Sequence, residues 1–200
     1  MSGGLARAGQ ASGGQGRQRP VFFQRSTLRS PYDIGPPRNL IPIDLFRVNP
    51  PYKIPRSVLV VIHTPDLRVL MMERAGWRGF WQSVTGSVTH ESEPLRDTAI
   101  REVHEETGLD AARYDLRDWG IENRFEIFKR HRSRYAPGVT HNLERVFSME
   151  VPAPFEVVLD PAEHLGFQWL PYRDAAALTI SSTNRDAILA LPRRRGASAA

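Results

Sequence analysis

The 200-residue sequence contains no cysteine. This absence excludes a disulfide framework, a zinc site with cysteine ligands and a thiol nucleophile. The sequence also lacks an apolar run of the roughly 18 residues that a membrane-spanning helix needs, and residues 1–20 lack the apolar core of a secretory signal. With 40% hydrophobic and 24% charged residues, the composition is typical of a globular protein. We therefore expect a cytoplasmic protein with no membrane as a partner.

Positive charge is concentrated near the start of the chain. The formal net charge is +5, from 27 basic and 22 acidic residues. Residues 1–48 contain seven arginines and two aspartates, which accounts for the whole excess, whereas residues 49–192 contain 17 basic and 20 acidic residues. The part expected to fold is therefore mildly acidic, which argues against nucleic acid as a partner.

Composition divides the chain into three parts. Residues 1–48 are rich in Arg, Gly and Pro, and we expect them to form a largely irregular N-terminal extension. Because no methionine lies between Met1 and Met71, a translation start near Val48 is an alternative. Residues 49–192 are long enough for one domain with a hydrophobic core. Residues 193–200 begin with three arginines and are expected to be a basic, flexible C-terminus.

Strand and helix patterns within residues 49–192 predict an α/β domain. The first strand is a continuous β-branched run, SVLVVIHT, which is typical of a buried strand. Strands are expected at residues 57–64, 68–73, 81–88, 118–129, 141–151 and 167–170. Helices are expected at residues 94–107, 172–178 and 184–191. Pro94 suits the first turn of its helix, and Gly108 suits the position just after its end.

Three glutamates lie close together on the helix expected at residues 94–107. At about 100° per residue, Glu102, Glu105 and Glu106 fall in one sector beside an apolar one. Like charges one turn apart destabilise a helix, so these side chains need either solvent or a cation. A solvated acidic face is one interpretation. A divalent cation is the other, because Mg²⁺ takes oxygen ligands, commonly one or two carboxylates together with substrate phosphates.

The sequence from Gly86 to Leu109 resembles the Nudix box. That pattern is Gly, five residues, Glu, seven residues, and then Arg-Glu-apolar-any-Glu-Glu-any-Gly-apolar. Here Gly86, Glu93 and Arg101 match its fixed positions, and the segment EVHEETGL follows Arg101. Six residues rather than five separate Gly86 from Glu93, and we expect the loop before the helix to absorb the extra one. The resemblance implies a Nudix-type α/β/α sandwich with a mixed β-sheet, and hydrolysis of a diphosphate linkage.

The resemblance also implies roles for the residues of the box. Glu102, Glu105 and Glu106 are implied as catalytic residues and as ligands of a divalent metal. The metal is Mg²⁺, with Mn²⁺ as a possible substitute. Structural support of the loop and helix is assigned to Gly86, Glu93, Arg101 and Gly108. The chemistry agrees with this assignment, because a divalent metal neutralises phosphate charge during hydrolysis.

Segments outside the box resemble a narrower group, the dihydroneopterin triphosphate diphosphatases of bacterial folate biosynthesis. They lie between about residues 52 and 191 and include SVLVVI, FEIF and EHLGFQWL. This group releases pyrophosphate from dihydroneopterin triphosphate and leaves the monophosphate. The resemblance implies a small-molecule triphosphate as the substrate. A broad-specificity (deoxy)nucleoside triphosphate pyrophosphatase and a non-catalytic Nudix binding module are the alternatives.

The narrower resemblance adds residues to the expected site. Glu163 is implied as a further metal ligand or as the general base for the attacking water. Substrate contacts are implied for Lys53, Arg74, Thr85, Phe125, Glu126, Ile127, Phe128 and Ser181. Because side chains alternate along a strand, we expect that not all four residues from 125 to 128 face the substrate. The alternative role for Ser181 is a helix N-cap.

The remaining charged and titratable residues give weaker indications. The six histidines show no metal-ligand spacing, and we expect most of them at the surface or in loops. The segment RHRSR at residues 130–134 is expected to attract the anionic substrate or to be a solvated loop. It lacks the interleaved aromatic residues typical of a nucleic-acid-binding face. No feature of the sequence predicts an oligomeric state.

Overall fold

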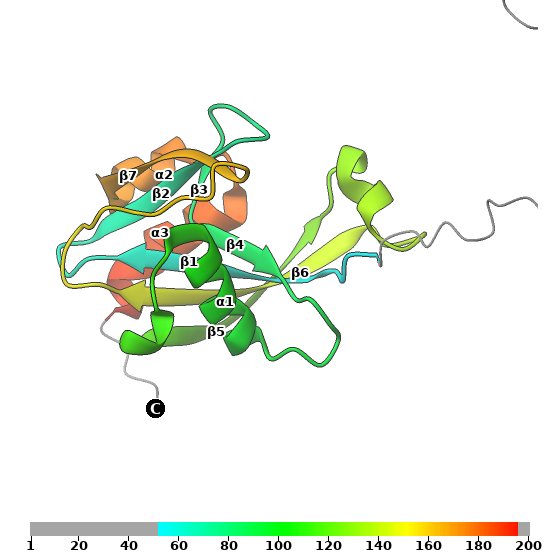
Figure 1. Ribbon diagram of the computed structural model, residues 1–200, viewed down its shortest axis with the longest axis horizontal. Coiled ribbons are helices and arrows are strands. Elements are labelled where there is room, and N and C mark those ends of the chain that lie inside the picture. Colours follow the sequence, from blue (N-terminus) through cyan, green and yellow to red (C-terminus); the bar gives the residue numbers. More distant parts are fainter. Residues whose placement is uncertain (1–51, 196–200) are drawn as a thin grey trace, which may run out of the picture. The chain divides into compact units, whose positions relative to one another are not determined.

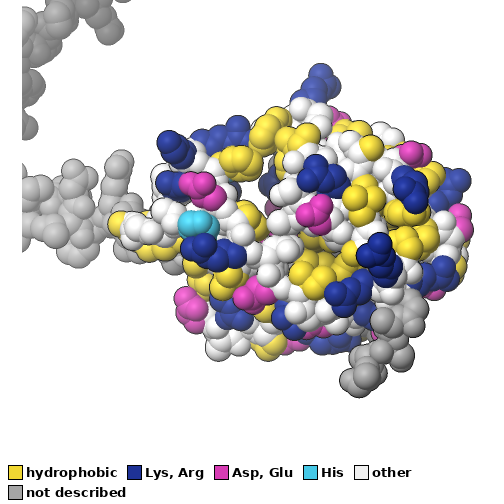
Figure 2. Space-filling model, turned by 180° about the vertical axis from the view of Figure 1, so that it is seen from behind, with side chains coloured by type: hydrophobic (Ala, Val, Ile, Leu, Met, Phe, Trp, Pro, Cys, Tyr) yellow, Lys and Arg dark blue, Asp and Glu magenta, His cyan; other side chains and the backbone are white. Residues whose placement is uncertain are grey.

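The structure is a computed structural model that describes residues 52–195. The predictions about residues 1–48 lie outside the described residues, as do residues 196–200. Within the described part, none of the helices has both the length and the apolar character needed to cross a membrane. On the face seen in Figure 2, lysine and arginine side chains are scattered among hydrophobic and acidic ones.

The described residues form a mixed seven-stranded sheet with helices on both of its faces (Figure 1). The strands are β1 (Arg56–His63), β2 (Arg68–Arg74), β3 (Trp81–Gln82), β4 (Val84–Ser87), β5 (Leu116–Glu126), β6 (His141–Glu150) and β7 (His164–Pro171). The α-helices are α1 (Leu95–Thr107), α2 (Tyr172–Leu178) and α3 (Ser182–Arg194), and two 3₁₀ helices are η2 (Ala111–Arg113) and η3 (Lys129–Arg134). The predicted α/β class with a mixed sheet is confirmed.

β1 is the strand from which the sheet divides. It runs parallel to β6 along its whole length, and β5 pairs antiparallel with β6 on the far side. On its other edge, the first half of β1 pairs with β4, whereas its last residue, His63, pairs with Val69 of β2. β2 in turn pairs with β3 and β7. One edge of β1 is therefore shared between two strands, with β4 along its first half and β2 at its end.

The core consists of two hydrophobic clusters, one on each face of the sheet. Val58, Val60 and Ile62 of β1 belong to the cluster that α1 covers. Leu59 and Val61 belong to the cluster that α2 and α3 cover (Figure 1). Successive side chains of a strand point to opposite faces, so a strand covered on both sides is apolar throughout. This arrangement explains the continuous β-branched run at residues 57–64.

Several segments differ from the sequence prediction. The strand expected at residues 81–88 is divided at Ser83, because β3 pairs with β2 and β4 pairs with β1. The segment at residues 130–134, for which a solvated loop was one expectation, belongs to the 3₁₀ helix η3, which begins at Lys129. The strand expected at residues 118–129 begins at Leu116, ends at Glu126 and changes register between Asp118 and Glu122.

The last helix is longer than the sequence predicts. α3 starts at Ser182 and continues through Pro192 to Arg194, so Arg193 and Arg194 are helical rather than part of the flexible end expected from residue 193. A proline in the last turn removes few backbone hydrogen bonds. The end of α3 is also held by side chains, because the guanidinium of Arg195 pairs with the Glu150 carboxylate at 2.8 Å.

Candidate active site

A cavity of about 560 Å³ lies where β4, the second half of α1 and the N-terminus of α3 meet β5 and β6. The residues predicted from the sequence that line it are Lys53, Arg74, Thr85, Gly86, Glu102, Glu105, Phe125, Glu126, Phe128, Glu163 and Ser181. The predicted residues that do not line it are Glu93, Arg101, Glu106, Gly108 and Ile127. The fold thus brings together segments from both ends of the domain.

The helix α1 positions the glutamates of the site. It begins directly after Pro94, whose missing N–H costs no helical bond there, and it ends before Gly108, which takes a left-handed φ of 73°. Within it Glu102 and Glu106 are buried, with 9% and 3% of their surface exposed, whereas Glu105 is exposed. A fully solvated acidic face, one of the two interpretations of this helix, is therefore excluded.

Arg101 joins the loop before α1 to the acidic face of the helix. Its Nε donates to Glu93 Oε1 at 3.1 Å and its Nη2 donates to the carbonyl oxygen of Ser87 at 2.9 Å. Its Nη1 donates to the carboxylates of Glu102 and Glu105, at 2.8 and 2.9 Å. One guanidinium therefore fixes two helical glutamates relative to the loop that follows β4.

Glu93 closes that loop. Its Oε2 accepts hydrogen bonds from the backbone N–H and the hydroxyl of Thr89, at 2.5 and 2.8 Å. Burial alone would raise the pKa of Glu93, but these bonds and Arg101 lower it to about 2. The backbone N–H of Glu93 also donates to the carbonyl oxygen of His90. Both the side chain and the backbone of Glu93 therefore hold the loop that contains the extra residue. Glu102 and Glu105 of α1 still line the cavity.

Gly86 of β4 lies directly against Glu102. A Cβ atom at residue 86 would be 1.7 Å from the carboxyl carbon of Glu102 and 2.0 Å from its Oε1. Only glycine leaves room for the buried carboxylate at this point of the strand. The sequence expectation that Gly86 supports the box therefore has a direct steric reason.

The surroundings of Glu102 disfavour its charged form. Burial raises its pKa to about 7; Arg101 opposes this shift, and the nearby carboxylates of Glu106 and Glu105 add to it. A carboxyl group that is half protonated near neutral pH would gain its full charge from a bound cation.

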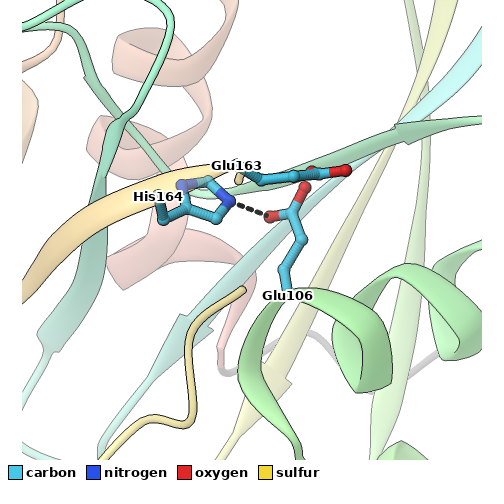
Figure 3. A group of neighbouring side chains, drawn as sticks. All are labelled: Glu106, Glu163 and His164. Atoms are coloured by element: carbon cyan, nitrogen blue, oxygen red, sulfur yellow. Dashed lines mark ion pairs between the residues drawn. The ribbon is translucent and has the colours of Figure 1, made fainter. Parts of the chain in front are cut away.

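Glu106 lies close to His164, the first residue of β7, and to Glu163, the residue before it (Figure 3). Ligand atoms of Glu106, Glu163 and His164 all lie within 4.8 Å of one another, with Glu163 exposed and the other two buried. Oε2 of Glu106 has no hydrogen-bond partner among the described residues, and His164 Nε2 lies 3.3 Å from it. Burial raises the pKa of Glu106, His164 lowers it and Glu163 raises it. Two carboxylates and an imidazole grouped in this way could hold a divalent cation.

His164 is an exception to the expectation that most histidines lie at the surface or in loops. His164 is 2% exposed. It is the first residue of β7, and in Figure 3 its imidazole and the carboxylate of Glu163, the residue before it, both lie close to Glu106. The sequence placed this strand at residues 167–170, so its start at His164 was not predicted.

Basic residues lie beside the carboxylates. The backbone N–H of Lys53 donates to the carbonyl oxygen of Arg134 at 2.8 Å. Burial lowers the pKa of the Lys53 ammonium, as do Arg134 and Arg74, while Glu102 and Glu163 raise it. Lys53, Arg74 and Arg134 all line the cavity. Such a group of positive charges next to carboxylates is suited to a polyphosphate held together with a cation.

Residues 125–128 divide between the cavity and the core. Phe125, Glu126 and Phe128 line the cavity. The Ile127 side chain is 5% exposed and lies outside the lining, while its backbone N–H donates to Thr140. The alternation of side chains along a strand does not separate Phe125 from Glu126 and Phe128 here. The reason is that β5 ends at Glu126 and the chain then turns into η3. Ile127 thus packs in the protein, and a side-chain contact to substrate is not supported.

Aromatic side chains surround the cavity at Phe128. The rings of Trp77 and Phe80 stack at 5.0 Å, and Phe128 meets Trp77 edge to face at 6.1 Å. The Arg130 guanidinium carbon lies 4.1 Å from the centre of the Trp77 ring. Glu126, by contrast, is exposed and paired with Arg132. Apolar rings thus lie beside charged side chains that are held by cation–π contact or by ion pairing.

The comparison with protein families agrees with the geometry of the cavity. The profile described as NUDIX domain matches residues 53–191. The chain belongs to the Nudix family. Nudix hydrolases act on small-molecule phosphate substrates and generally use a divalent metal, so this chain is an enzyme that acts on pyrophosphate bonds.

Several Nudix relatives are similar to this chain over most of their length. The dihydroneopterin triphosphate diphosphatase of Escherichia coli strain K12 is 48% identical over 140 residues, which are 68% of this chain and 91% of the relative. That of Haemophilus influenzae is 44% identical, over 68% and 87%. A solved structure of the E. coli dihydroneopterin triphosphate pyrophosphohydrolase matches with a TM-score of 0.64, covering 68% of this chain and 94% of that one.

Sequence reasoning missed part of the cavity of this Nudix domain. Gln82, Ser57, Asn142, Glu144 and Thr183 line it as well. Asn142 and Glu144 are buried polar residues in β6, where the remaining buried positions are mostly apolar. Polar residues at alternate positions of such a strand are the sequence signal that indicates a site. Ser181, which was assigned two alternative roles, lines the cavity and also accepts a hydrogen bond from Asn184 N–H as the N-cap of α3.

Proposed function

We propose that this Nudix enzyme is a Mg²⁺-dependent dihydroneopterin triphosphate diphosphatase. The observation that carries the proposal is the cavity in which carboxylates from α1 and Glu163 face the basic residues Lys53 and Arg74. The relatives with 44–48% identity over most of their length, which bear this name, support the substrate. The reaction adds one water across the bond between the α- and β-phosphates. It yields dihydroneopterin monophosphate and pyrophosphate.

In this proposal four carboxylates hold the metal, and one of them also serves as the general base. Glu102, Glu105, Glu106 and Glu163 would hold Mg²⁺, or Mn²⁺ as a substitute, which supplies positive charge to neutralise the phosphate oxygens. Glu163 is exposed at the cavity and is suited to accept the proton of the attacking water. Glu106, by contrast, is nearly inaccessible to water.

The basic and polar residues of the cavity would bind the substrate. Lys53 and Arg74 carry the positive charges that oppose the triphosphate. Thr85 and Ser181 provide hydroxyl groups in the same lining, and Phe125 and Phe128 provide ring surface for the pterin.

A substrate panel with Mg²⁺ tests the proposal. The full chain is incubated with dihydroneopterin triphosphate and with each common deoxynucleoside triphosphate, and pyrophosphate and orthophosphate are quantified separately. We expect pyrophosphate in equal amount to the monophosphate, with higher kcat/KM for the pterin than for any nucleotide. Faster turnover of a nucleotide would favour the broad-specificity pyrophosphatase. Absence of hydrolysis throughout would favour a non-catalytic module.

The role of Glu163 is tested with a matched pair of variants. Glu163→Gln removes the charge but keeps the shape of the side chain, and we expect kcat to fall by about 10²- to 10⁴-fold. Glu156→Gln changes an exposed glutamate in the segment between β6 and β7 that lies outside the cavity, and it should leave kcat unchanged. Equal rates for the two variants would contradict the assignment.

We propose further that residues 49–192 contain all that this activity needs, since the family match spans residues 53–191. The Arg-rich residues 1–48 would then be dispensable for turnover. As a separate proposal, we place the protein in the cytoplasm. A chain that starts at Val48 should keep the kcat/KM of the full chain. A large loss on truncation would assign a catalytic role to the extension.

A further inference from the structure

Two buried polar side chains of β6, Asn142 and Glu144, line the active-site cavity. They are 3% and 6% exposed. As alternate residues of one strand they face the same side of the sheet. The strand register places Glu144 beside Ser57 of β1 and Asn123 of β5, and it places Asn142 opposite Phe125.

Asn142 presents an unused hydrogen-bond acceptor. Its Nδ2 donates to the Ser57 hydroxyl at 2.6 Å, whereas its Oδ1 is buried with no hydrogen-bond partner among residues 52–195. Buried polar atoms in folded proteins nearly always have a partner, and leaving one unpaired is costly. The free acceptor of Asn142 therefore points to a ligand that donates.

Glu144 presents a second acceptor. Its Oε1 accepts from Asn123 Nδ2 at 3.3 Å, and no ion pair of Glu144 occurs in the described part of the chain. Burial raises the pKa of Glu144, and hydrogen bonds from Thr183 and Asn123 oppose the shift only in part. A buried carboxylate without a cation is stabilised when neutral N–H groups of a ligand donate to it.

The matching ligand is one whose edge carries two adjacent N–H donors. The 2-amino-4-oxopyrimidine ring, shared by pterins and guanine, has a ring N–H next to an exocyclic amino group. A carboxylate accepts both in a bidentate pair. The adenine and cytosine edges each present an amino donor beside a ring acceptor, which would face the carboxylate oxygen unfavourably. Phe125, opposite Asn142, offers ring surface to the same heterocycle.

We infer that Glu144 and Asn142 form the subsite that recognises the 2-amino-4-oxopyrimidine edge of the substrate. This inference rests on the proposed function, because it explains how a triphosphate hydrolase distinguishes a pterin from adenine and cytosine nucleotides. It assigns recognition to Glu144 rather than to Glu126, which is exposed and paired with Arg132. Glu144 contacts the heterocycle and takes no part in the hydrolysis itself.

Binding of unphosphorylated rings without Mg²⁺ tests the subsite independently of turnover. The full chain is titrated with neopterin and guanosine, and with inosine and adenosine, which lack the 2-amino group, using calorimetry. We expect neopterin and guanosine to bind more tightly than inosine and adenosine. Glu144→Gln should weaken the first two by about 10- to 150-fold, the usual range for a hydrogen bond to a charged group. It should weaken inosine, which keeps only the ring N–H, by less, and should leave adenosine unchanged.

Two further variants make the test decisive. Glu122→Gln changes an exposed carboxylate of β5 outside the cavity and should bind all four rings as the original chain does. Asn142→Leu removes the free acceptor with little change of volume and should weaken neopterin and guanosine in the same direction. If thermal unfolding shows that Glu144→Gln does not fold, the binding data for Asn142→Leu decide whether the subsite exists. Unchanged ring selectivity in a folded Glu144→Gln or Asn142→Leu protein would overturn the inference.

Turnover separates this inference from the proposed function. With Mg²⁺, Glu144→Gln should lower the ratio of kcat/KM for dihydroneopterin triphosphate to that for dCTP by about 10- to 150-fold. If the original chain did not hydrolyse dihydroneopterin triphosphate but still bound neopterin and guanosine selectively, the proposed function would fail and the subsite would stand. If it hydrolysed the pterin and Glu144→Gln kept the same ratio, the subsite would fail and the function would stand.

Discussion

Gly86 and Glu102 are packed so closely that a Cβ atom on the first would lie 1.7 Å from the carboxyl carbon of the second. The two residues come from β4 and α1, on either side of the loop that Glu93 closes. The missing side chain of Gly86 is thus what allows a buried carboxylate to reach the edge of the sheet. Any larger residue must displace Glu102, β4 or both.

Replacing Gly86 with alanine should therefore inactivate the enzyme. A shift of about 1 Å in a catalytic group can cost about 10²-fold in rate, and we expect kcat/KM to fall by at least that factor. Gly76→Ala is the matched control, because a Cβ atom there meets no atom within 4 Å and its activity should not change. Steady-state kinetics with Mg²⁺ measures both. Normal activity of Gly86→Ala would show that Glu102 is not required in this position.

Glu93→Gln should destabilise the domain without a change in the cavity lining. The pKa of Glu93 is lowered from 4.5 to about 2, so its charged form stabilises the fold above pH 4.5, and this contribution is lost as the pH falls through about 2. We expect the variant to lose about 2–3 kcal/mol in free energy of unfolding at pH 7. Urea denaturation at pH 7 and at pH 2.5 measures the effect, which should be smaller at the lower pH.

The neighbouring Glu91→Gln is the control for this prediction. Glu91 is exposed in the same loop, and its replacement should change the free energy of unfolding by less than about 0.5 kcal/mol at either pH. An equal loss in both variants would assign the effect to the net charge of the loop instead of to the hydrogen bonds of Glu93.

Local sequence signals determine much of the fold. The β-branched run at residues 57–64 predicted β1, and Pro94 and Gly108 predicted the ends of α1 to within one residue. The division of the segment 81–88 was not predicted, because Ser83 is where the chain leaves β2 for β1. That change of partner depends on tertiary pairing rather than on local propensity.

The site shows the same division between local and long-range information. The glutamates of α1 follow a long spaced pattern in one segment, and the resemblance found them directly. Asn142 and Glu144 belong to the cavity only because β6 pairs with β1 and β5. His164 becomes buried only where β7 meets α1. Neither placement follows from spacing along the chain.

Glu102 should make the stability of the chain without metal depend on pH. Its pKa is raised from 4.5 to about 7 in the folded state, so the folded protein binds more protons than the unfolded one between these values. The free energy of unfolding therefore decreases as the pH rises from about 4.5 to 7. After allowance for solvent screening, we expect about 2 kcal/mol from this group.

Urea denaturation in EDTA at pH 5 and pH 8 measures the contribution of Glu102. The original chain should lose more stability between these pH values than Glu102→Gln, which has no charge to gain. Mg²⁺ prefers the ionised carboxyl, so its affinity for the original chain should rise with pH up to about 7 and then level off. An equal pH dependence in both proteins would contradict the raised pKa.

His164→Gln should weaken metal binding through Glu106. His164 lowers the raised pKa of the buried Glu106 carboxyl, so removing the imidazole should raise that pKa further and favour the protonated form. Loss of a residue that orients a metal-binding carboxylate commonly costs about 10- to 100-fold in metal affinity, and we expect a loss in that range for Mg²⁺. The pH at which binding becomes half-maximal should also move upward, an effect that a purely structural role would not produce. Calorimetric titration with Mg²⁺ between pH 6 and 9 measures both quantities, with His104→Gln, on the exposed side of α1, as the control that should match the original chain.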